Sequence, residues 1–431
     1  MSTQKHRFET LALHAGQDPD PATTARGVPV HRTSSYAFRN AEHAANLFGL
    51  KELGNIYTRI MNPTQDVLEK RMAALEGGAA ALALASGTSA VYYSIINICR
   101  AGDEVVSANN LYGGTYTMFD SILPQFGITV RFVDHDKPVG FEAAINERTR
   151  AVYIETIGNP VLGVSDIGAI AAVARKHHLP LIVDSTFATP YLCNPIAHGA
   201  NIVVHSLTKW LGGHGTGIGG VVVDAGNFDW TDEKFALYNE PDAGYHGIRY
   251  AHDLGELSPL AFVLRMRLVP LRNLGACIAP DNAWMFLQGI ETLPLRMQRH
   301  CDNGLAVARF LASHEQVSWV RYPGLPGDPS YGTAGKYLRN GFGGMVVFGV
   351  KGGYDSAVRL IDTIGLFSHV ANVGDAKSLI LHPSSTSHSQ LSPEQQKSSG
   401  LTPELVRLSV GLENIDDLKE ALDVALKKAH A

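Results

Sequence analysis

Strand-length apolar runs alternate with amphipathic stretches through the middle of the chain. The clearest unit is "RAVYIETIGNP", followed by "DIGAIAAVARKHH" and then "LPLIVDSTF". An apolar run, a helical stretch with one apolar face and a second apolar run predict a strand–helix–strand crossover with parallel strands buried on both faces. A further run, "ANIVVH", leads into "SLTKWLGGHG", and "GGVVVD" follows. Together these segments predict one large α/β sheet domain.

The pattern differs on either side of this region. Residues 1–62 are polar and irregular, and "DPDPATTARG" is typical of a loop, so we expect an extended arm. Regular elements begin at "TQDVLEKRMAALEGG", a helix that two glycines end. A long helical stretch, "DNAWMFLQGIETLPLRMQRHCDNGLAVARFLASH", begins near residue 281, and strand-like "GGMVVFGVKGG" and "LVRLSVG" follow it. We therefore expect an α/β domain over 63–280 and a smaller α+β domain over 281–431.

Composition narrows the possible partners. Lys and Arg number 36 against 41 Asp and Glu, for a net charge of −5, and no basic run is interleaved with aromatic residues, so nucleic acid is not expected. The first residues lack the apolar segment of a secretory signal and no apolar run is long enough to span a bilayer, so we expect a cytosolic protein without a membrane partner. The four cysteines form no C-x-x-C pair, and no histidine cluster has ligand spacing, so no metal is expected.

Three polar residues fall at the ends of predicted strands: Asn159, Asp184 and Lys209. Ligands of open α/β sheets bind beyond the carboxyl ends of the strands, so an acid and a lysine there can face one ligand. Pyridoxal 5′-phosphate (PLP) needs such a pair, because a lysine holds it as a Schiff base and a carboxylate keeps its pyridine nitrogen protonated. The sequence thus indicates Lys209 as the Schiff-base lysine and Asp184 as its acidic partner.

A phosphate site is also indicated. Ser206 and Thr208 place hydroxyls around the lysine, and "SGTSA" places Gly87 and Thr88 where a helix follows a strand, which favours an anion. Simpler interpretations exist, since a lone lysine after a strand is usually solvated and an aspartate there often caps a helix. The run from Gly215 to Gly220 fits G-x-G-x-x-G, but it leads into a strand rather than a helix, which argues against a dinucleotide site.

Several motifs occur together and in order: "YTRIMNPT", "ASGTSA", "NNLYGGT", "ETIGNP", "IVDSTFATPYL", "HSLTKWLGGHG", "GDAKSLILHPSSTSHSQLS" and "LVRLSVGLENIDDL". Over nearly the whole chain the sequence resembles the Cys/Met-metabolism family of PLP enzymes, nearest to its O-acetylhomoserine sulfhydrylase branch. The resemblance implies an aspartate aminotransferase-like, fold type I transferase with a large, mostly parallel sheet domain and a smaller C-terminal α+β domain.

The resemblance also implies roles for individual residues. Lys209 would carry PLP and then move protons, while Tyr112 would stack on the cofactor ring and assist acid–base chemistry near Cγ of the substrate. Asp184 would pair with the pyridine nitrogen and Asn159 with the phenolic oxygen. The remaining residues fall into three groups: phosphate ligands (Gly87, Thr88, Ser206, Thr208), contributors to the neighbouring subunit's site (Tyr57, Arg59), and ligands of the substrate carboxylate (Arg407, Ser378, with Asn159 nearby).

The implied reaction is a γ-replacement on O-acetyl-L-homoserine with sulfide or methanethiol, giving L-homocysteine or L-methionine and acetate. A site shared between subunits implies at least a homodimer, and family habit implies a homotetramer. Cystathionine γ-synthase, γ- or β-lyase and O-succinylhomoserine sulfhydrylase activities remain open, as does a catalytically silent scaffold. Methionine γ-lyases carry a cysteine where this chain has Gly114, which argues against a lyase, and the loop "HPSSTSHSQLS" favours a sulfhydrylase.

Overall fold

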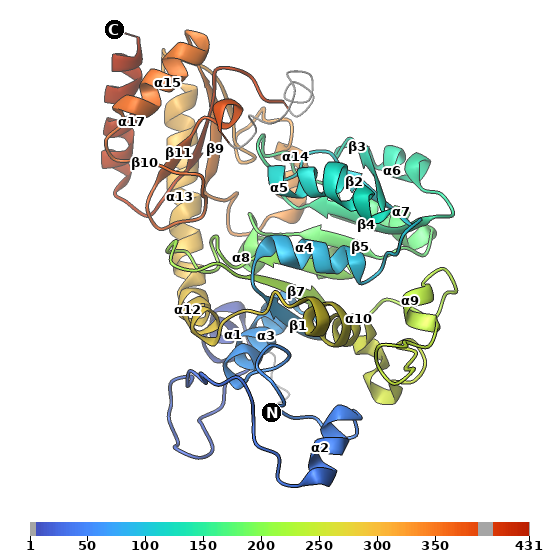
Figure 1. Ribbon diagram of the computed structural model, residues 1–431. Coiled ribbons are helices and arrows are strands. Elements are labelled where there is room, and N and C mark those ends of the chain that lie inside the picture. Colours follow the sequence, from blue (N-terminus) through green and yellow to red (C-terminus); the bar gives the residue numbers. More distant parts are fainter. Residues whose placement is uncertain (1–5, 387–399, 431) are drawn as a thin grey trace.

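The chain folds around two β-sheets (Figure 1), in a computed structural model that describes residues 6–386 and 400–430. Among the described residues the larger sheet has seven strands, in the order β1-β7-β6-β5-β4-β2-β3. These strands are β1 (Ala80–Leu84), β2 (Glu104–Ala108), β3 (Thr129–Val133), β4 (Thr149–Glu155), β5 (Leu181–Asp184), β6 (Ile202–Ser206) and β7 (Gly220–Asp224). Strands β2 to β6 run parallel, whereas β7 is antiparallel to both of its neighbours.

The predicted crossover is present as β4, α7 (Ile167–Lys176) and β5. Its strands are apolar because both faces of the sheet are covered, and Ile154 and Val183 have no exposed surface. The pairing register sets Glu155 directly beside Asp184, so two acidic residues end adjacent strands at the same edge. This edge carries the candidate site.

Helices cover the larger sheet and continue the chain between its strands (Figure 1). The α-helices of residues 6–279 outside the crossover, with two in the N-terminal arm, are α1 (Phe8–His14), α2 (Ala41–Phe48), α3 (Pro63–Glu76), α4 (Gly87–Ile96), α5 (Gly113–Thr117), α6 (Pro138–Ala144), α8 (Thr189–Leu192), α9 (Ala236–Asn239), α10 (Ala261–Met266) and α11 (Arg272–Leu274). Helix α3 begins where the Asn62 side chain accepts the Thr64 N–H, and it ends at Gly77 with φ 74°. The helix predicted there and the glycine that ends it are both confirmed.

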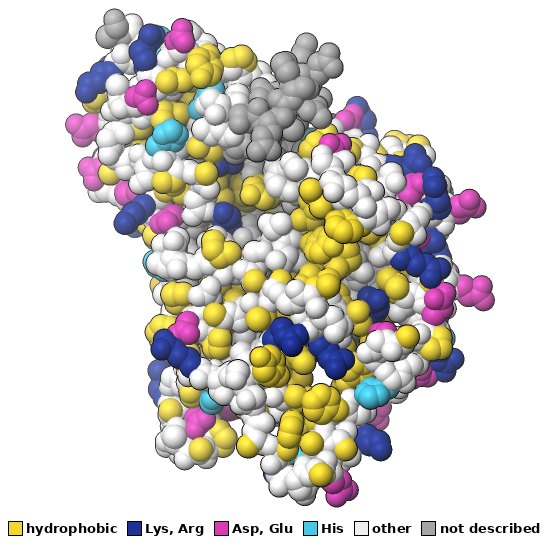
Figure 2. All heavy atoms as spheres, in the orientation of Figure 1, with side chains coloured by type: hydrophobic (Ala, Val, Ile, Leu, Met, Phe, Trp, Pro, Cys, Tyr) yellow, Lys and Arg dark blue, Asp and Glu magenta, His cyan; other side chains and the backbone are white. Residues whose placement is uncertain are grey.

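The N-terminal arm is more ordered than the sequence suggests. It contains two helices, α1 and α2. Helix α1 packs against the core, since Ala12 is fully buried and Phe8 lies edge-on against Tyr191, with ring centroids 5.6 Å apart. Helix α2 lies at the end of the molecule furthest from the smaller sheet (Figure 1). Figure 2 shows hydrophobic side chains gathered over this region, where Phe38, Phe48 and Leu53 are exposed.

The smaller sheet has five strands among the described residues, in the order β10-β11-β12-β9-β8. They are β8 (Val317–Arg321), β9 (Met345–Val350), β10 (Ser368–His369), β11 (Leu379–Leu381) and β12 (Leu405–Ser409). The helices of this half are α12 (Pro280–Glu291), α13 (Leu293–Ala312), α14 (Tyr331–Tyr337), α15 (Gly353–Thr363) and α17 (Ile415–Ala429). Helix α13 passes from beside α12 up to the smaller sheet, where α15 and α17 pack together (Figure 1). The predicted α+β character is confirmed.

Two details of this half bear on the predictions. The single long helix expected from residue 281 is two helices, which meet at Thr292, and Pro294 in the first turn of α13 cannot donate a backbone hydrogen bond. Most of the loop "HPSSTSHSQLSPEQQKSSG", residues 387–399, lies outside the described residues. Boundaries at residues 62 and 280 stay a prediction. No helix in the described part of the chain is long and apolar enough to cross a bilayer.

Candidate active site

Lys209 lies in the connection between β6 and β7, three residues beyond the carboxyl end of β6. Its backbone is held on both sides: the N–H donates to the Ser206 carbonyl (3.3 Å), and the carbonyl accepts the Gly213 N–H (2.7 Å). The next residue, Trp210, is completely buried and anchors the turn in the core. The lysine backbone is therefore fixed at the sheet edge where ligands of α/β proteins bind.

The amine of Lys209 is partly buried, and its Nζ donates a hydrogen bond to Oδ1 of Asn372 at 2.5 Å. Burial lowers the pKa of Lys209 to about 8, and the positive charge of Arg407 contributes to the same shift. Both effects disfavour the ammonium form. With a pKa of about 8, roughly a tenth of the amine is neutral at pH 7, far more than in an ordinary lysine, which makes this lysine a competent nucleophile and base.

Asp184 is the last residue of β5, and burial raises the pKa of its carboxyl. Oδ1 accepts the N–H of Thr186 at 2.9 Å, and the Thr186 hydroxyl accepts the N–H of Ser206 at 2.9 Å. The ends of β5 and β6 are thus tied together. A cationic group bound beside this carboxyl would favour its ionised form, which is what a protonated ring nitrogen supplies.

Gly87, at the start of α4, lies beside Ser206, at the end of β6, and we call this place the cradle. Ser86 caps the helix, since its Oγ accepts the Ser89 N–H at 3.0 Å. A Cβ on Gly87 would lie 2.6 Å from Cβ and 2.9 Å from Oγ of Ser206, so only glycine allows this approach. Thr88 is exposed in the first turn. First-turn N–H groups beside hydroxyls suit an anion such as a phosphate.

Thr208, the last of the predicted phosphate ligands, also stabilises the connection between β6 and β7. Its hydroxyl accepts the N–H of Gly219 at 3.1 Å. Gly219 directly precedes β7, so this bond fixes the far end of the connection that carries Lys209. The structure thus brings Gly87 and Ser206 together at the cradle and places Thr208 in the lysine connection.

Two of the predicted substrate ligands, Arg407 and Asn159, contact each other in the site. Arg407 of β12 is buried, and its Nη1 donates to Oδ1 of Asn159 at 3.1 Å. Burial lowers the pKa of Arg407 to about 10, so the guanidinium stays charged, and the phenol of Tyr112 opposes that shift. Tyr112 precedes α5, with half of its surface exposed, which leaves its ring available to a ligand. A Cβ on Gly114 would lie 2.6 Å from this ring.

Three predicted residues stand apart from this cluster. Ser378 is fully buried, and its hydroxyl donates to Oε2 of Glu413 (2.8 Å) and accepts the Gly411 N–H (2.8 Å), so its side chain is already engaged. Tyr57 and Arg59 lie on the arm, where the guanidinium stacks over the Tyr57 ring at 5.4 Å from its centroid. The Tyr57 side chain is partly exposed, available to another chain. The roles of all three stay predictions.

Two further residues belong to the site although the sequence did not single them out. Glu155 is buried beside Asp184, and its Oε1 accepts the N–H of Tyr112 at 2.7 Å. Its position at a strand end was a signal that could have identified it. Asn372 contacts Lys209 from a loop between β10 and β11, and no local pattern marks that residue.

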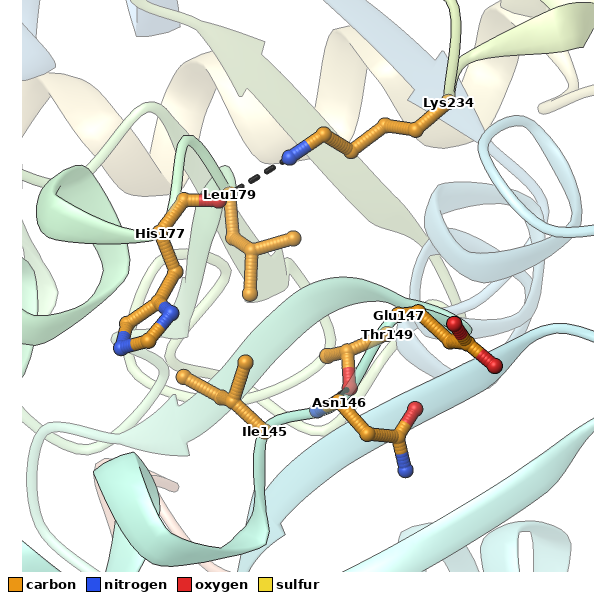
Figure 3. Close-up of a pocket in the computed structure, with 7 residues that line it drawn as sticks. All are labelled: Ile145, Asn146, Glu147, Thr149, His177, Leu179 and Lys234. Atoms are coloured by element: carbon orange, nitrogen blue, oxygen red, sulfur yellow. Dashed lines mark hydrogen bonds between the residues drawn. The ribbon is translucent and has the colours of Figure 1, made fainter.

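A separate pocket lies at the other edge of the sheet (Figure 3). Its volume is about 350 Å³, and Thr149 at the start of β4 contributes to its wall. The Nζ of Lys234 closes one side by donating to the carbonyl of His177 at 3.0 Å. The lining residues are Ile145, Asn146, Glu147, Thr149, His177, Leu179 and Lys234. Because this pocket is at the amino ends of the strands, it is distinct from the Lys209 site.

The Lys209 site fits one cofactor. The amine has a lowered pKa, a buried carboxyl ends the adjacent strand, and a glycine opens a cradle beside hydroxyls and a helix N-terminus. PLP requires a lysine, an acidic partner for its ring nitrogen and an anion site for its phosphate. The fold and the site together define a PLP-dependent enzyme.

Comparison with known proteins gives the family. The chain belongs to the family described as Cys/Met metabolism PLP-dependent enzymes, whose model matches residues 9–427. The family, the fold type I architecture and the PLP cofactor predicted from the sequence are therefore confirmed.

Similar proteins include sulfhydrylases from distant organisms. The chain is 55% identical to the O-acetyl-L-homoserine sulfhydrylase of Leptospira meyeri, over 97% of this chain and 96% of that protein. It is 52% identical to O-acetyl-L-homoserine sulfhydrylase 1 of Thermus thermophilus (97% and 100%) and 50% identical to the homocysteine synthase of Schizosaccharomyces pombe (99% and 100%). A Campylobacter jejuni crystal structure, described as an O-acetylhomoserine (thiol)-lyase containing N′-pyridoxyl-lysine-5′-monophosphate, has a TM-score of 0.94 at 41% identity, covering 98% of this chain and all of that one.

Proposed function

We propose that this chain catalyses γ-replacement on O-acetyl-L-homoserine, in which sulfide or methanethiol replaces acetate to give L-homocysteine or L-methionine. The observation that carries the proposal is the proximity of Lys209 and Arg407 in one site, a base beside a buried cation that could bind a carboxylate. The full-length similarity to sulfhydrylases and a homocysteine synthase supports the choice of substrate.

Each residue of the site has a proposed role that follows from its position. Arg407 would bind the substrate α-carboxylate through its guanidinium fork, with Asn159 orienting that fork. Lys209 would take the proton from Cα and return it at the end, since a pKa near 8 suits both transfers. Tyr112 would cover the reacting atoms with its exposed ring and assist proton transfer near Cγ. Asp184 would keep the ring nitrogen of bound PLP protonated, and the cofactor supplies the electron sink.

Gly87, Thr88, Ser206 and Thr208 would hold the cofactor phosphate at the start of α4. The proximity of Gly87 to Ser206 supports this assignment. Ser378 would help to hold the substrate α-carboxylate, and this role requires Glu413 to give way, because Glu413 accepts both the hydroxyl and the backbone N–H of Ser378.

We also propose a homodimer at the least, and a tetramer by analogy with the family, in which Tyr57 and Arg59 complete the partner subunit's site. Exposed apolar side chains on the arm support an interface there: Leu53 is 70% exposed, and Phe38 and Phe48 are about as exposed as Tyr57. We place the enzyme in the cytosol, and the four free cysteines support a reducing compartment.

The decisive test is a competition. Purified enzyme with PLP and O-acetyl-L-homoserine would receive sulfide, methanethiol and cysteine at equal concentrations, and the sulfur products would be quantified by mass spectrometry. We expect homocysteine or methionine to dominate. Dominant cystathionine would indicate a cystathionine γ-synthase, and ammonia with a keto acid would indicate a lyase. Repeating the assay with O-succinyl-L-homoserine tests the leaving group.

Matched lysine variants check the cofactor assignment. Lys209→Ala should lose activity and the borohydride-fixed attachment of PLP. Lys428→Ala, on the exposed last turn of α17, should keep both. A wild-type protein that stays colourless with added PLP would overturn the enzyme proposal and favour a scaffold.

A further inference from the structure

A loop of the C-terminal half, residues 370–376 between β10 and β11, packs onto the turn that carries Lys209. The Ala376 N–H donates to the Gly213 carbonyl at 2.8 Å. Gly374 has φ 77°, and a Cβ there would lie 2.6 Å from the Trp210 nitrogen. Loop and turn are thus in backbone contact at two positions that follow the lysine, Trp210 and Gly213, which fixes their relative position.

The loop also reaches the lysine itself. Oδ1 of Asn372 accepts a hydrogen bond from Nζ of Lys209 at 2.5 Å, and the Asn372 N–H is held by the Val370 carbonyl at 2.9 Å. Within residues 6–386 and 400–430, this amide is the hydrogen-bond partner of the lysine amine. The contact joins side chains 163 residues apart in the sequence.

We propose that Asn372 is a positioning residue for Lys209: it holds the amine whenever the lysine is not attached to the cofactor, and so aims it for proton transfer at the substrate. The proposal rests on the proposed function, in which the amine of Lys209 takes a proton from the substrate and returns it. A free lysine side chain has four carbons to reorient, and a fixed acceptor limits that freedom.

The acceptor for the Lys209 amine is the amide oxygen of Asn372, and its lack of charge affects the protonation of that amine. An amide oxygen accepts the hydrogen bond without adding charge, whereas a carboxylate there would form an ion pair and favour the ammonium form. Arg407 is the charged group that acts on this amine in the described structure, and it favours the neutral form. Asparagine therefore orients the amine while leaving it able to accept a proton.

Three variants test this role: Asn372→Ala removes the acceptor, Asn372→Asp keeps an oxygen in its place, and His369→Ala on β10 is a control at an exposed position before the same loop. In the homocysteine assay, Asn372→Ala should lower kcat about 10-fold, the effect of one lost hydrogen bond in the transition state. KM for O-acetyl-L-homoserine should change much less, and the control should match the wild type.

A second readout does not depend on catalysis. In the full-length protein freed of PLP, Lys209 would be acylated with an amine-selective reagent from pH 6 to 10, and its peptide quantified by mass spectrometry. The midpoint should move to lower pH in Asn372→Ala, because the ammonium loses its acceptor, and to higher pH in Asn372→Asp. Thermal unfolding of each variant confirms that it is folded.

Unchanged Lys209 midpoints in both variants would overturn the proposal, as would a kcat of Asn372→Ala equal to that of the wild type. Equal losses of kcat with unchanged midpoints would show a structural role only. A wild-type enzyme that forms no homocysteine or methionine would instead overturn the proposed function, and the acylation midpoints would still report whether Asn372 holds the amine.

Discussion

Replacing Glu155 separates two contributions of its buried carboxyl to the stability of the fold, a hydrogen bond and a charge. Its Oε1 accepts the Tyr112 N–H at 2.7 Å, and the side chain is almost fully buried, so solvent does not replace the bond. Glu155→Ala leaves the donor unsatisfied, which should cost about 1–3 kcal/mol of unfolding free energy. Glu155→Gln keeps an acceptor oxygen of the same shape and should avoid that cost.

The charge of Glu155 adds a pH dependence. Burial, together with the charge of Asp184, raises the pKa of Glu155 well above its ordinary value. A carboxyl with a raised pKa in the folded state stabilises the fold at low pH, and that stability is lost as pH rises towards the folded-state pKa. Glutamine does not titrate, so the stability of Glu155→Gln relative to the wild type should be greater at pH 8 than at pH 5.

The assay is thermal unfolding of the cofactor-free protein at both pH values. A difference of about 1 kcal/mol corresponds to a Tm shift of roughly 2–4 °C in domains of this size. We expect Glu155→Ala to melt below Glu155→Gln at both pH values. A glutamine variant that melts as low as the alanine variant, or one whose advantage does not grow with pH, would refute the reasoning.

Two further predictions concern the cofactor and the substrate. Gly87→Ala should weaken PLP binding by roughly 5- to 150-fold, the equivalent of about 1–3 kcal/mol of overpacking against Ser206. A PLP titration followed by absorbance measures this affinity. Gly332→Ala, where a Cβ meets open space, is the control. Arg407→Lys should raise KM for O-acetyl-L-homoserine roughly 10- to 100-fold with a smaller effect on kcat, because lysine keeps the charge but not the fork. Unchanged affinity in the first variant, or an unchanged KM in the second, would contradict these assignments.

The sequence was most informative where local pattern and strand geometry coincide. Buried parallel strands are continuously apolar, so a polar residue at the end of such a run stands out, and Asp184 and Lys209 were predicted on that basis. The same pattern marks Glu155, which is the last residue of β4. The family resemblance supplied residues whose local sequence is unremarkable, such as Arg407.

Contacts between distant segments were not predictable. Asn372 lies in a loop without periodicity, and only the packing of that loop on the Lys209 turn gives it a role. Of the two helices in the arm that the sequence pattern did not predict, α1 is stabilised by packing on α3 rather than by its own composition. The engagement of the Ser378 hydroxyl by Glu413 likewise depends on a contact 35 residues away.

The antiparallel strand β7 links the two halves of the cofactor site. Gly220 pairs with Leu84 of β1 on one side and with Ser206 of β6 on the other. The cradle at Gly87 begins three residues after Leu84, and Lys209 lies three residues after Ser206, so one strand sets both positions. A single-residue insertion or deletion in β7 would shift this register and displace Gly87, which would hold the phosphate, relative to Lys209, which would hold the aldehyde, so β7 should not tolerate changes in length.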